Sequence, residues 1–357
     1  MWMRVALQML KEKMGEGPGV QSAIAMVERS LADATRDSYT NKLNLFADFL
    51  RQTGRTIPAR EHDIMVYIGW LHERGGIQES SLQPYLSCIN KLHVALGFEK
   101  PAVGDNIATQ RKGMARLQAE EPDALRDERI ALPASVLCDI LALGERKDID
   151  ISTLRAATAV CLTYAFFGRG GSGAALRAED VGVDTDGIWV RNIQEKGKAH
   201  KKERRIYRLP LSGKGTKYLR RLAPLLQRFA EERESAFRTR GFEPGESFWA
   251  LPREPQPRTD DMNTWLQQVL GAVGVAPPPG FAYQAHSLRK GAASAAHCIG
   301  VSLVQIRYMG GWSATSTTVE KHYIDPTFRA DFAASQWFGW LLPHRPRVRI
   351  NEHYEDA

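Results

Sequence analysis

The sequence has few cysteines and no long hydrophobic run. The four cysteines, Cys88, Cys138, Cys161 and Cys298, form no CxxC pair, which argues against a disulfide framework or a thiolate metal clip. No run of 18 apolar residues occurs, and the N-terminal residues lack the pattern of a signal peptide. Hydrophobic residues make up 43% and charged residues 25%, as in ordinary globular proteins. We therefore expect a folded intracellular protein with reduced thiols and no membrane segment.

Motifs for nucleotide and metal chemistry are also missing. The sequence contains no P-loop, and no group of His, Cys, Asp or Glu has the spacing of a metal site. Any catalysis is therefore expected to use the chain's own side chains, without cofactor, metal or ATP. The net charge of +7 is unevenly distributed. Residues 1–130 hold 17 basic and 17 acidic side chains, whereas residues 131–357 hold 31 and 24. This excess favours a polyanionic partner.

Apolar periodicity and breaker residues predict two units in the 357 residues. We expect an N-terminal extension over 1–20, a helical domain over 21–121, a polar linker over 122–132, a mixed domain over 133–342 and a tail over 343–357. In the mixed domain, strands near 187–193 and 205–209 would form a hairpin with a long loop. Helices are expected at 133–146, 151–168, 215–235, 260–273, 286–299, 302–309, 315–324 and 327–341. The predicted fold class is mainly α (α+β), with one small antiparallel sheet.

Two segments carry arginines in places suited to an anion. His286 and Arg289 would lie on one face at the start of a helix, where free N–H groups also favour negative charge. Arg169 would end a strongly apolar helix and enter a glycine-rich turn, which lets a ligand approach the backbone. Taken singly, each pattern also fits an ordinary helix terminus or a solvated helix face.

Two further segments also fit either a functional role or an ordinary structural one. The loop between the predicted strands is strongly basic, and a basic hairpin tip can enter a DNA groove, although charge runs are usually solvated loops. Its cationic residues are Lys196, Lys198, Lys201, Lys202, Arg204 and Arg205. Tyr323, which follows a polar helix start, is either a nucleophile or a core tyrosine.

In this order and spacing, the four segments resemble the tyrosine recombinase (phage integrase) family. Arg169 with Leu176-Arg177 and Asp180 matches the first box of the family, and His286 to Gly291 matches its HxLRxG box. Trp312 follows Arg289 by the family's spacing, and Tyr323 comes next. Of the hairpin lysines, Lys196 matches best, with Lys198 the rival. The helical segments of residues 21–121 resemble the family's DNA-clamping domain, with Arg111 and Lys112 as candidate DNA contacts.

The sequence departs from the family pattern at two places. Ser172 stands where the family usually carries Glu or Asp, which helps to orient the arginine. The interval from Trp312 to Tyr323 is two residues longer than usual, and Lys321 occupies the expected position of the tyrosine. We interpret this as a two-residue insertion before the tyrosine, because Tyr308, which precedes Trp312, fits the pattern badly.

The resemblance implies cleavage and rejoining of DNA strands through a 3′-phosphotyrosine. Tyr323 would attack the scissile phosphate, Arg169 and Arg289 would stabilise the transition state, and Lys196 would protonate the leaving 5′ oxygen. His286 would assist proton transfer, and Trp312 would donate its indole N–H to a phosphate oxygen. A type IB topoisomerase-like enzyme, or a catalytically inert DNA-binding protein of the same fold, remains an alternative.

The resemblance also implies an assembly on double-stranded DNA that carries paired inverted-repeat sites. We expect a monomer in free solution and a homo-tetramer on DNA. Residues 327–341 form an aromatic segment that must bury its apolar surface. We expect it to dock on a neighbouring protomer, the alternative being that it folds back on its own domain.

Overall fold

A computed structural model describes residues 22, 33–120, 128–192, 205–241, 246–325, 328–329 and 332–342. The chain divides into two compact units, residues 1–125 and 126–357, each of which has its own hydrophobic core. The fold is mainly helical with a small antiparallel sheet, which confirms the predicted fold class. No helix in the described ranges is long and apolar enough to cross a membrane.

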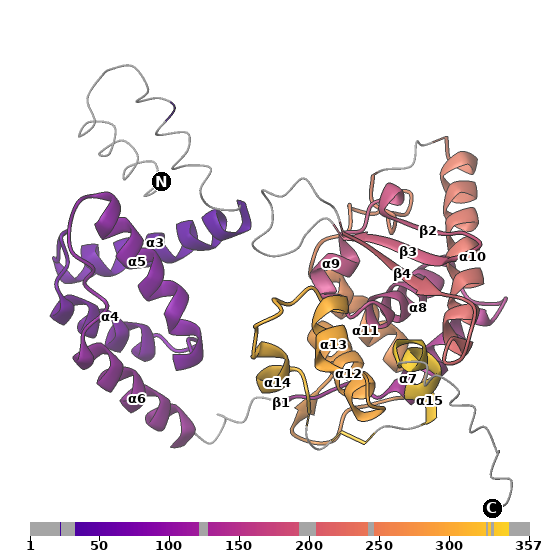
Figure 1. The fold of residues 1–357 in the computed structure, drawn as a ribbon. Coiled ribbons are helices and arrows are strands. Elements are labelled where there is room, and N and C mark those ends of the chain that lie inside the picture. The colour runs from indigo at the N-terminus through magenta and orange to yellow at the C-terminus, as the bar shows by residue number, and fades with distance from the viewer. Residues whose placement is uncertain are drawn as a thin grey trace, which may run out of the picture. The chain divides into compact units, whose positions relative to one another are not determined.

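The described part of the first unit consists of helices (Figure 1). They are α3 (Asp33–Thr53), α4 (Glu61–Glu73), the short 3-10 helix η1 (Glu79–Ser81), α5 (Leu82–Ala95) and α6 (Asp105–Glu120). The 3–4 spacing of apolar residues along α3 places Phe46 and Phe49 in the core, where their rings contact Tyr67 of α4. Arg111 of α6 forms an ion pair with Glu79, and Lys112 beside it is exposed.

The second unit is built around α8 (Ile151–Ala165), which is buried from Leu154 to its end. Figure 1 shows helices α7 (Ala134–Glu145), α10 (Lys217–Thr239), α11 (Asp261–Ala272) and α12 (Ala285–Cys298) around it. Asp150 caps α8, since its side chain accepts a hydrogen bond from the Thr153 backbone N–H at 2.9 Å. Because α8 is buried on every side from Leu154 onward, it needs this enclosure, which explains its central place.

The predicted hairpin is present as β3 (Gly187–Asn192) and β4 (Arg205–Pro210), paired antiparallel from Gly187–Pro210 to Asn192–Arg205. A third strand, β2 (Val181–Val183), joins the sheet beside β3 and was not expected from the sequence. A second pairing brings β1 (Glu128–Arg129) parallel to β5 (Phe281–Ala282), directly before α12. The remaining elements are α9 (Gly170–Ala174), η2 (Ala178–Asp180), α13 (Leu303–Met309), α14 (Thr318–His322), α15 (Phe332–Phe338) and η3 (Gly339–Leu341).

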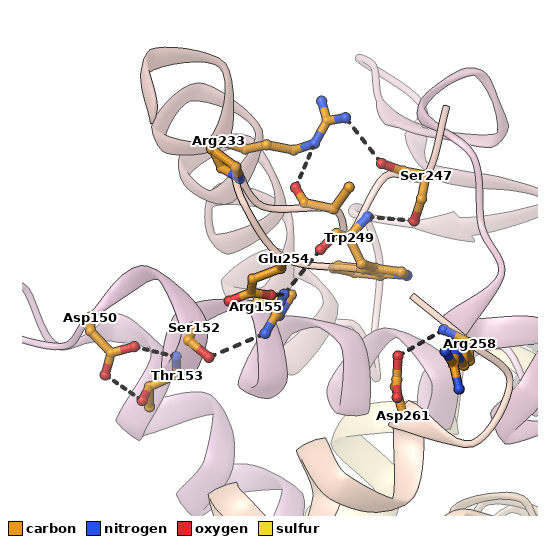
Figure 2. A network of polar contacts seen from close by, with 12 residues as sticks. Asp150, Ser152, Thr153, Arg155, Arg233, Ser247, Trp249, Glu254, Arg258 and Asp261 are labelled. Carbon is orange, nitrogen blue, oxygen red and sulfur yellow. Dashed lines mark hydrogen bonds and ion pairs between the residues drawn. The ribbon is translucent and has the colours of Figure 1, made fainter. Parts of the chain in front are cut away.

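Two buried arginines anchor the segment that follows residue 246, as Figure 2 shows. Arg155 of α8 contacts the Trp249 carbonyl at 3.3 Å and Ser152 at 3.2 Å, and it pairs with Glu254. Arg233 of α10 donates to the Ala250 carbonyl at 3.2 Å and to the Ser247 carbonyl at 3.0 Å. These bonds give partners to buried carbonyls in a segment without regular structure.

The C-terminal aromatic segment packs within its own unit, which corrects the expectation that it docks on a neighbouring protomer. Trp337 and Phe338 are fully buried, and their rings contact Tyr164, Tyr218 and Phe167. Helix α15 (Phe332–Phe338) is also shorter than the helix predicted over 327–341. The described residues 328–329 are not helical. Phe332 is 75% exposed, so the core leaves part of the segment's apolar surface uncovered.

Candidate active site

Arg289 lies on the second turn of α12 and is only 1% exposed. Its guanidinium donates to the Phe167 carbonyl at 2.7 Å and to the Gly310 carbonyl at 2.7 Å. It also lies 3.6 Å from the centroid of the Trp312 ring, a cation–π geometry. Burial and then the charge of Arg169 lower its pKa to about 9, while Tyr323 acts in the opposite direction. Arg289 therefore stays cationic at neutral pH in a fixed orientation.

The chain leaves α8 through a turn that creates one of these acceptors. Phe167 has a φ of 58°, in the left-handed region that a bulky residue rarely adopts. The conformation is held by hydrogen bonds from the Phe167 and Gly168 N–H groups to Tyr164 and Thr163. The Phe167 ring is buried against Phe338, while its carbonyl faces Arg289. The turn thus orients the buried guanidinium. The strained backbone conformation of Phe167 is enforced by the surrounding core.

Three aromatic groups surround Arg289. Tyr323 follows α14 and is 8% exposed, and its ring lies 5.2 Å from the Arg289 guanidinium carbon. The Tyr323 ring centroid is 5.0 Å from that of His286 and 4.9 Å from that of Trp312. The structure therefore brings His286, Arg289, Trp312 and Tyr323 together. Tyr308, the other tyrosine considered, is 57% exposed on α13.

Arg169 stands at the N-cap of α9, whose first turn packs tightly on α12. A Cβ on Gly170 would come 2.4 Å from the Ala285 side chain, so glycine is required for this approach. The charge of Arg169 contributes to lowering the pKa of both Arg289 and His286, which shows that the three groups converge. None of the described residues forms a hydrogen bond or ion pair with the Arg169 side chain. Its guanidinium is thus free to meet a ligand.

The other residues of the motif that begins at Arg169 differ in burial. Leu176 is in the core, and Asp180 is fully buried at the end of η2. Arg177 is exposed and lies 3.6 Å from Glu246. Ser172, at the position of the usual acidic residue, is partly buried within α9.

An open pocket of about 350 Å³ lies beside the Tyr323 ring. Its basic lining residues are Arg129, His286, Lys290 and His322, and Ser287, Thr318 and Tyr323 complete it. Among the described residues, no acidic side chain lines this pocket. Its charge therefore suits a polyanion such as a phosphodiester backbone.

Sequence reasoning missed Arg129 and His322 as members of this pocket. Arg129 was assigned to the linker, because a strand of two residues leaves no periodic pattern. His322 lies beside Tyr323 in the sequence but belongs to none of the motifs. Their place beside the site depends on the pairing of β1 with β5 and on the fold of α14, neither of which a local motif encodes.

The basic hairpin loop falls largely outside the described residues. This applies to Lys196, Lys198, Lys201, Lys202 and Arg204. Arg205 begins β4, with its backbone in register with Asn192. Along the chain, the loop joins β3 to β4. Within the described ranges, no group of three or more His, Cys, Asp or Glu side chains could hold a metal ion.

The last residue of the HxLRxG motif has a steric reason to be glycine. A Cβ on Gly291 would lie 2.1 Å from the Leu132 carbonyl oxygen and 2.9 Å from its nitrogen. We expect Gly291→Ala to lower the free energy of unfolding by about 1–3 kcal/mol, because backbone cannot easily yield. Denaturant unfolding measures the change. Gly271→Ala in α11, where a Cβ would meet nothing within 4 Å, is the matched control and should stabilise slightly. Equal effects at both positions would contradict the steric explanation.

His286 is exposed, yet the pKa of its imidazole is lowered, first by desolvation and then by Arg289, Arg129, Arg169 and Lys290. The neutral form is therefore favoured in the folded protein. The associated stability is complete above the ordinary pKa of about 6.5 and is lost as pH falls from there through the lower folded-state value. We expect Arg129→Gln to raise the pKa of His286, as measured by NMR titration. Arg220→Gln, on an exposed part of α10, should leave the pKa unchanged, and an equal shift would rule out the local field as the cause.

Comparison with known proteins agrees with this architecture. Residues 25–100 match the family model of the phage integrase N-terminal SAM-like domain. A search of curated proteins finds no match. Solved structures with the same fold are tyrosine recombinases, at sequence identities low enough that the likeness concerns the fold. Residues 25–100 are thus similar to the N-terminal SAM-like domain of phage integrases, and the chain has the same fold as the solved recombinases and integrases, as the resemblance implied.

Three solved structures are similar over most of their length. The XerH site-specific recombinase bound to palindromic difH substrate has a TM-score of 0.60 and 11% identity, covering 87% of this chain and 82% of that chain. A Tn1549 transposon integrase in complex with transposon right end DNA has a TM-score of 0.54 and 12% identity, covering 93% and 97%. A lambda integrase dimer bound to a COC′ core site has a TM-score of 0.51 and 15% identity, covering 85% and 93%.

Proposed function

We propose that the protein is a site-specific DNA recombinase that cuts and rejoins strands through a 3′-phosphotyrosine. The observation that carries this proposal is the packing of Tyr323 against Arg289, His286 and Trp312 at the edge of a basic pocket. The fold supports it, because the similar solved structures are recombinases and integrases bound to DNA. Integration, excision and resolution would all use this chemistry.

In the proposed reaction, the Tyr323 hydroxyl oxygen attacks the scissile phosphorus. A P–O bond to tyrosine forms, the bond to the 5′ oxygen breaks, and the 3′ phosphate stays on the enzyme. Arg289 and Arg169 stabilise the charge that develops on the equatorial oxygens. Because Arg289 is already oriented by two carbonyls, little reorganisation is needed when that charge appears. The phosphotyrosine conserves the energy of the phosphodiester, so rejoining needs no ATP.

Proton transfers complete the cycle. The leaving 5′ oxygen takes a proton from Lys196, and the tyrosine hydroxyl gives up its proton with help from His286. The lowered pKa of His286 keeps the imidazole neutral at pH 7, so it can accept a proton. The indole N–H of Trp312 donates to a phosphate oxygen.

The proposed partner is double-stranded DNA with paired inverted-repeat sites, on which four protomers assemble from monomers. The protein would then act wherever its host DNA lies. The first unit and the basic hairpin loop would contribute contacts to phosphates. Of the candidates in the first unit, exposed Lys112 is available, whereas Arg111 would have to exchange its ion pair with Glu79.

Trapping on a suicide substrate tests the proposal. DNA nicked near the cleavage site loses a short strand after cleavage, so the covalent adduct accumulates and the joined peptide can be identified. An adduct at Tyr323 that resolves into recombinant strands is the expected result. Specific binding without any adduct would instead favour an inert DNA-binding protein. Relaxation of supercoils without partner sites would favour a topoisomerase.

Lys196 has a test of its own, as the proposed general acid. We expect Lys196→Ala to slow cleavage by about 100–10,000-fold, the usual worth of general acid catalysis. A 5′-bridging phosphorothiolate substrate releases a thiolate that needs no proton, so it should restore cleavage by this variant. Arg289→Ala should show no such rescue, because its loss concerns charge on the equatorial oxygens. Rescue of Lys198→Ala instead would transfer the role to Lys198.

A further inference from the structure

The residues beside Tyr323 are tied to α12 by a buried serine. The Ser294 hydroxyl donates to the Tyr323 carbonyl at 3.0 Å and accepts from the Asp325 backbone N–H at 2.9 Å. Ser294 is fully buried. One side chain of α12 therefore fixes the backbone of the proposed nucleophile and of the residue two positions later.

An ion pair adds a second anchor on the same helix. The Lys290 ammonium lies 3.2 Å from an Asp325 carboxylate oxygen, and the two side chains are only 18% and 14% exposed. Such partial burial strengthens the attraction relative to a surface pair. Lys290 also donates to the Arg129 carbonyl at 3.3 Å, which connects it to β1.

The contacts of Ser294 and Lys290 matter because the short helix before Tyr323 holds its backbone only weakly. It follows α14, which has only five residues, and an isolated helix of this length is unstable. Backbone bonds from Tyr323 and Ile324 to the Val319 carbonyl, both 2.9 Å, close the turn. Beyond these local bonds, the anchors on α12 fix the backbone that carries the ring.

We propose that Lys290, Asp325 and Ser294 are positioning residues that hold Tyr323 at the reacting phosphate. The proposal rests on the proposed function for its catalytic consequence. Lys290 is adjacent to Arg289, so one turn of α12 holds both the phosphate-binding arginine and the anchor of the nucleophile. The distance between these two groups is thereby set by a single rigid element, as efficient attack requires.

The first measurement reads the position of Tyr323 without DNA. Enzymatic iodination followed by mass spectrometry reports the accessibility of each tyrosine, with exposed Tyr308 as internal standard. In the unmodified protein, Tyr323 should label slowly, since it is 8% exposed against 57% for Tyr308. Asp325→Asn and Ser294→Ala should each increase labelling of Tyr323 several-fold while leaving Tyr308 unchanged.

The second measurement is the rate of covalent adduct formation at saturating DNA. We expect the same two variants to slow it by about 10- to 100-fold, with DNA affinity changed less than about threefold. Asp325→Glu keeps the carboxylate that pairs with Lys290 and should retain more of the rate than Asp325→Asn. Glu145→Gln is the matched control, because it breaks the Arg221–Glu145 pair elsewhere in the unit and should leave rate and labelling unchanged.

The outcomes separate this inference from the proposed function. If the unmodified protein forms no adduct, the proposed function fails, but the labelling still reports the anchor. Unchanged labelling of Tyr323 in both single variants overturns the anchor. Increased labelling with an unchanged adduct rate overturns its catalytic role. If Asp325→Asn proves poorly folded by circular dichroism, Ser294→Ala decides by the same criteria.

Discussion

Tyr323→Phe is expected to bind DNA as tightly as the unmodified protein and to form no covalent adduct. The substitution removes only the hydroxyl, so the ring can still pack against His286 and Trp312. Without that oxygen no phosphotyrosine can form, and we expect cleavage to fall by at least about 1,000-fold. The measurement is single-turnover adduct formation on the suicide substrate, with binding followed by mobility shift.

Tyr308→Phe provides the matched control, because it removes the same atom from an exposed tyrosine on α13. It should leave the cleavage rate unchanged. An adduct that survives in Tyr323→Phe and maps to Tyr308 would show that the interpretation of the two-residue insertion is wrong.

Arg289→Ala is expected to damage both catalysis and folding. Loss of one charge-assisted contact in the transition state costs about 100–1,000-fold in rate. The same change leaves the buried carbonyls of Phe167 and Gly310 without their donor, at about 1–3 kcal/mol for an unsatisfied buried group. Cleavage kinetics and denaturant unfolding measure the two effects separately.

Arg169→Ala supplies the contrast, because none of the described residues bonds to its side chain. We expect a similar loss of rate with little loss of stability. Arg289→Lys keeps the charge but cannot reach both carbonyls with a planar fork, so it should recover only part of the rate. Equal losses of rate and DNA affinity in either arginine variant would mean that the arginines merely anchor phosphates.

Sequence patterns predicted the long helices and strands better than the short strands and the tertiary packing. The apolar run of α8 and the alternating strands of the hairpin gave elements close to those observed. The three residues of β2 and the two-residue strands β1 and β5 are too short to leave a periodic signal. Trp337 and Phe338 are buried in their own unit. The sequence could not decide between this core and a partner, because apolar periodicity shows which face of a helix is buried but not what covers it.

The candidate site contains residues that sequence motifs indicate and residues that only the fold brings to it. The motifs led to His286, Arg289, Trp312 and Tyr323, which lie together, although their chemical roles are still predictions. Arg129 and the Lys290–Asp325 pair could not be found in this way, because each depends on a contact between segments far apart in the chain. The carbonyl contacts of Arg289 were invisible for the same reason: any residue type can supply a carbonyl.

The two carbonyls that hold Arg289 come from residues 122 positions before it and 21 after it. During synthesis, both carbonyls are therefore in place only after Gly310 has left the ribosome, and Tyr323, the proposed nucleophile, emerges later still. Under the proposed function, a growing or truncated chain that ends before this point would carry both arginines but no nucleophile. The order of the residues along the chain would thus delay the proposed cleavage until most of the second unit has been synthesised.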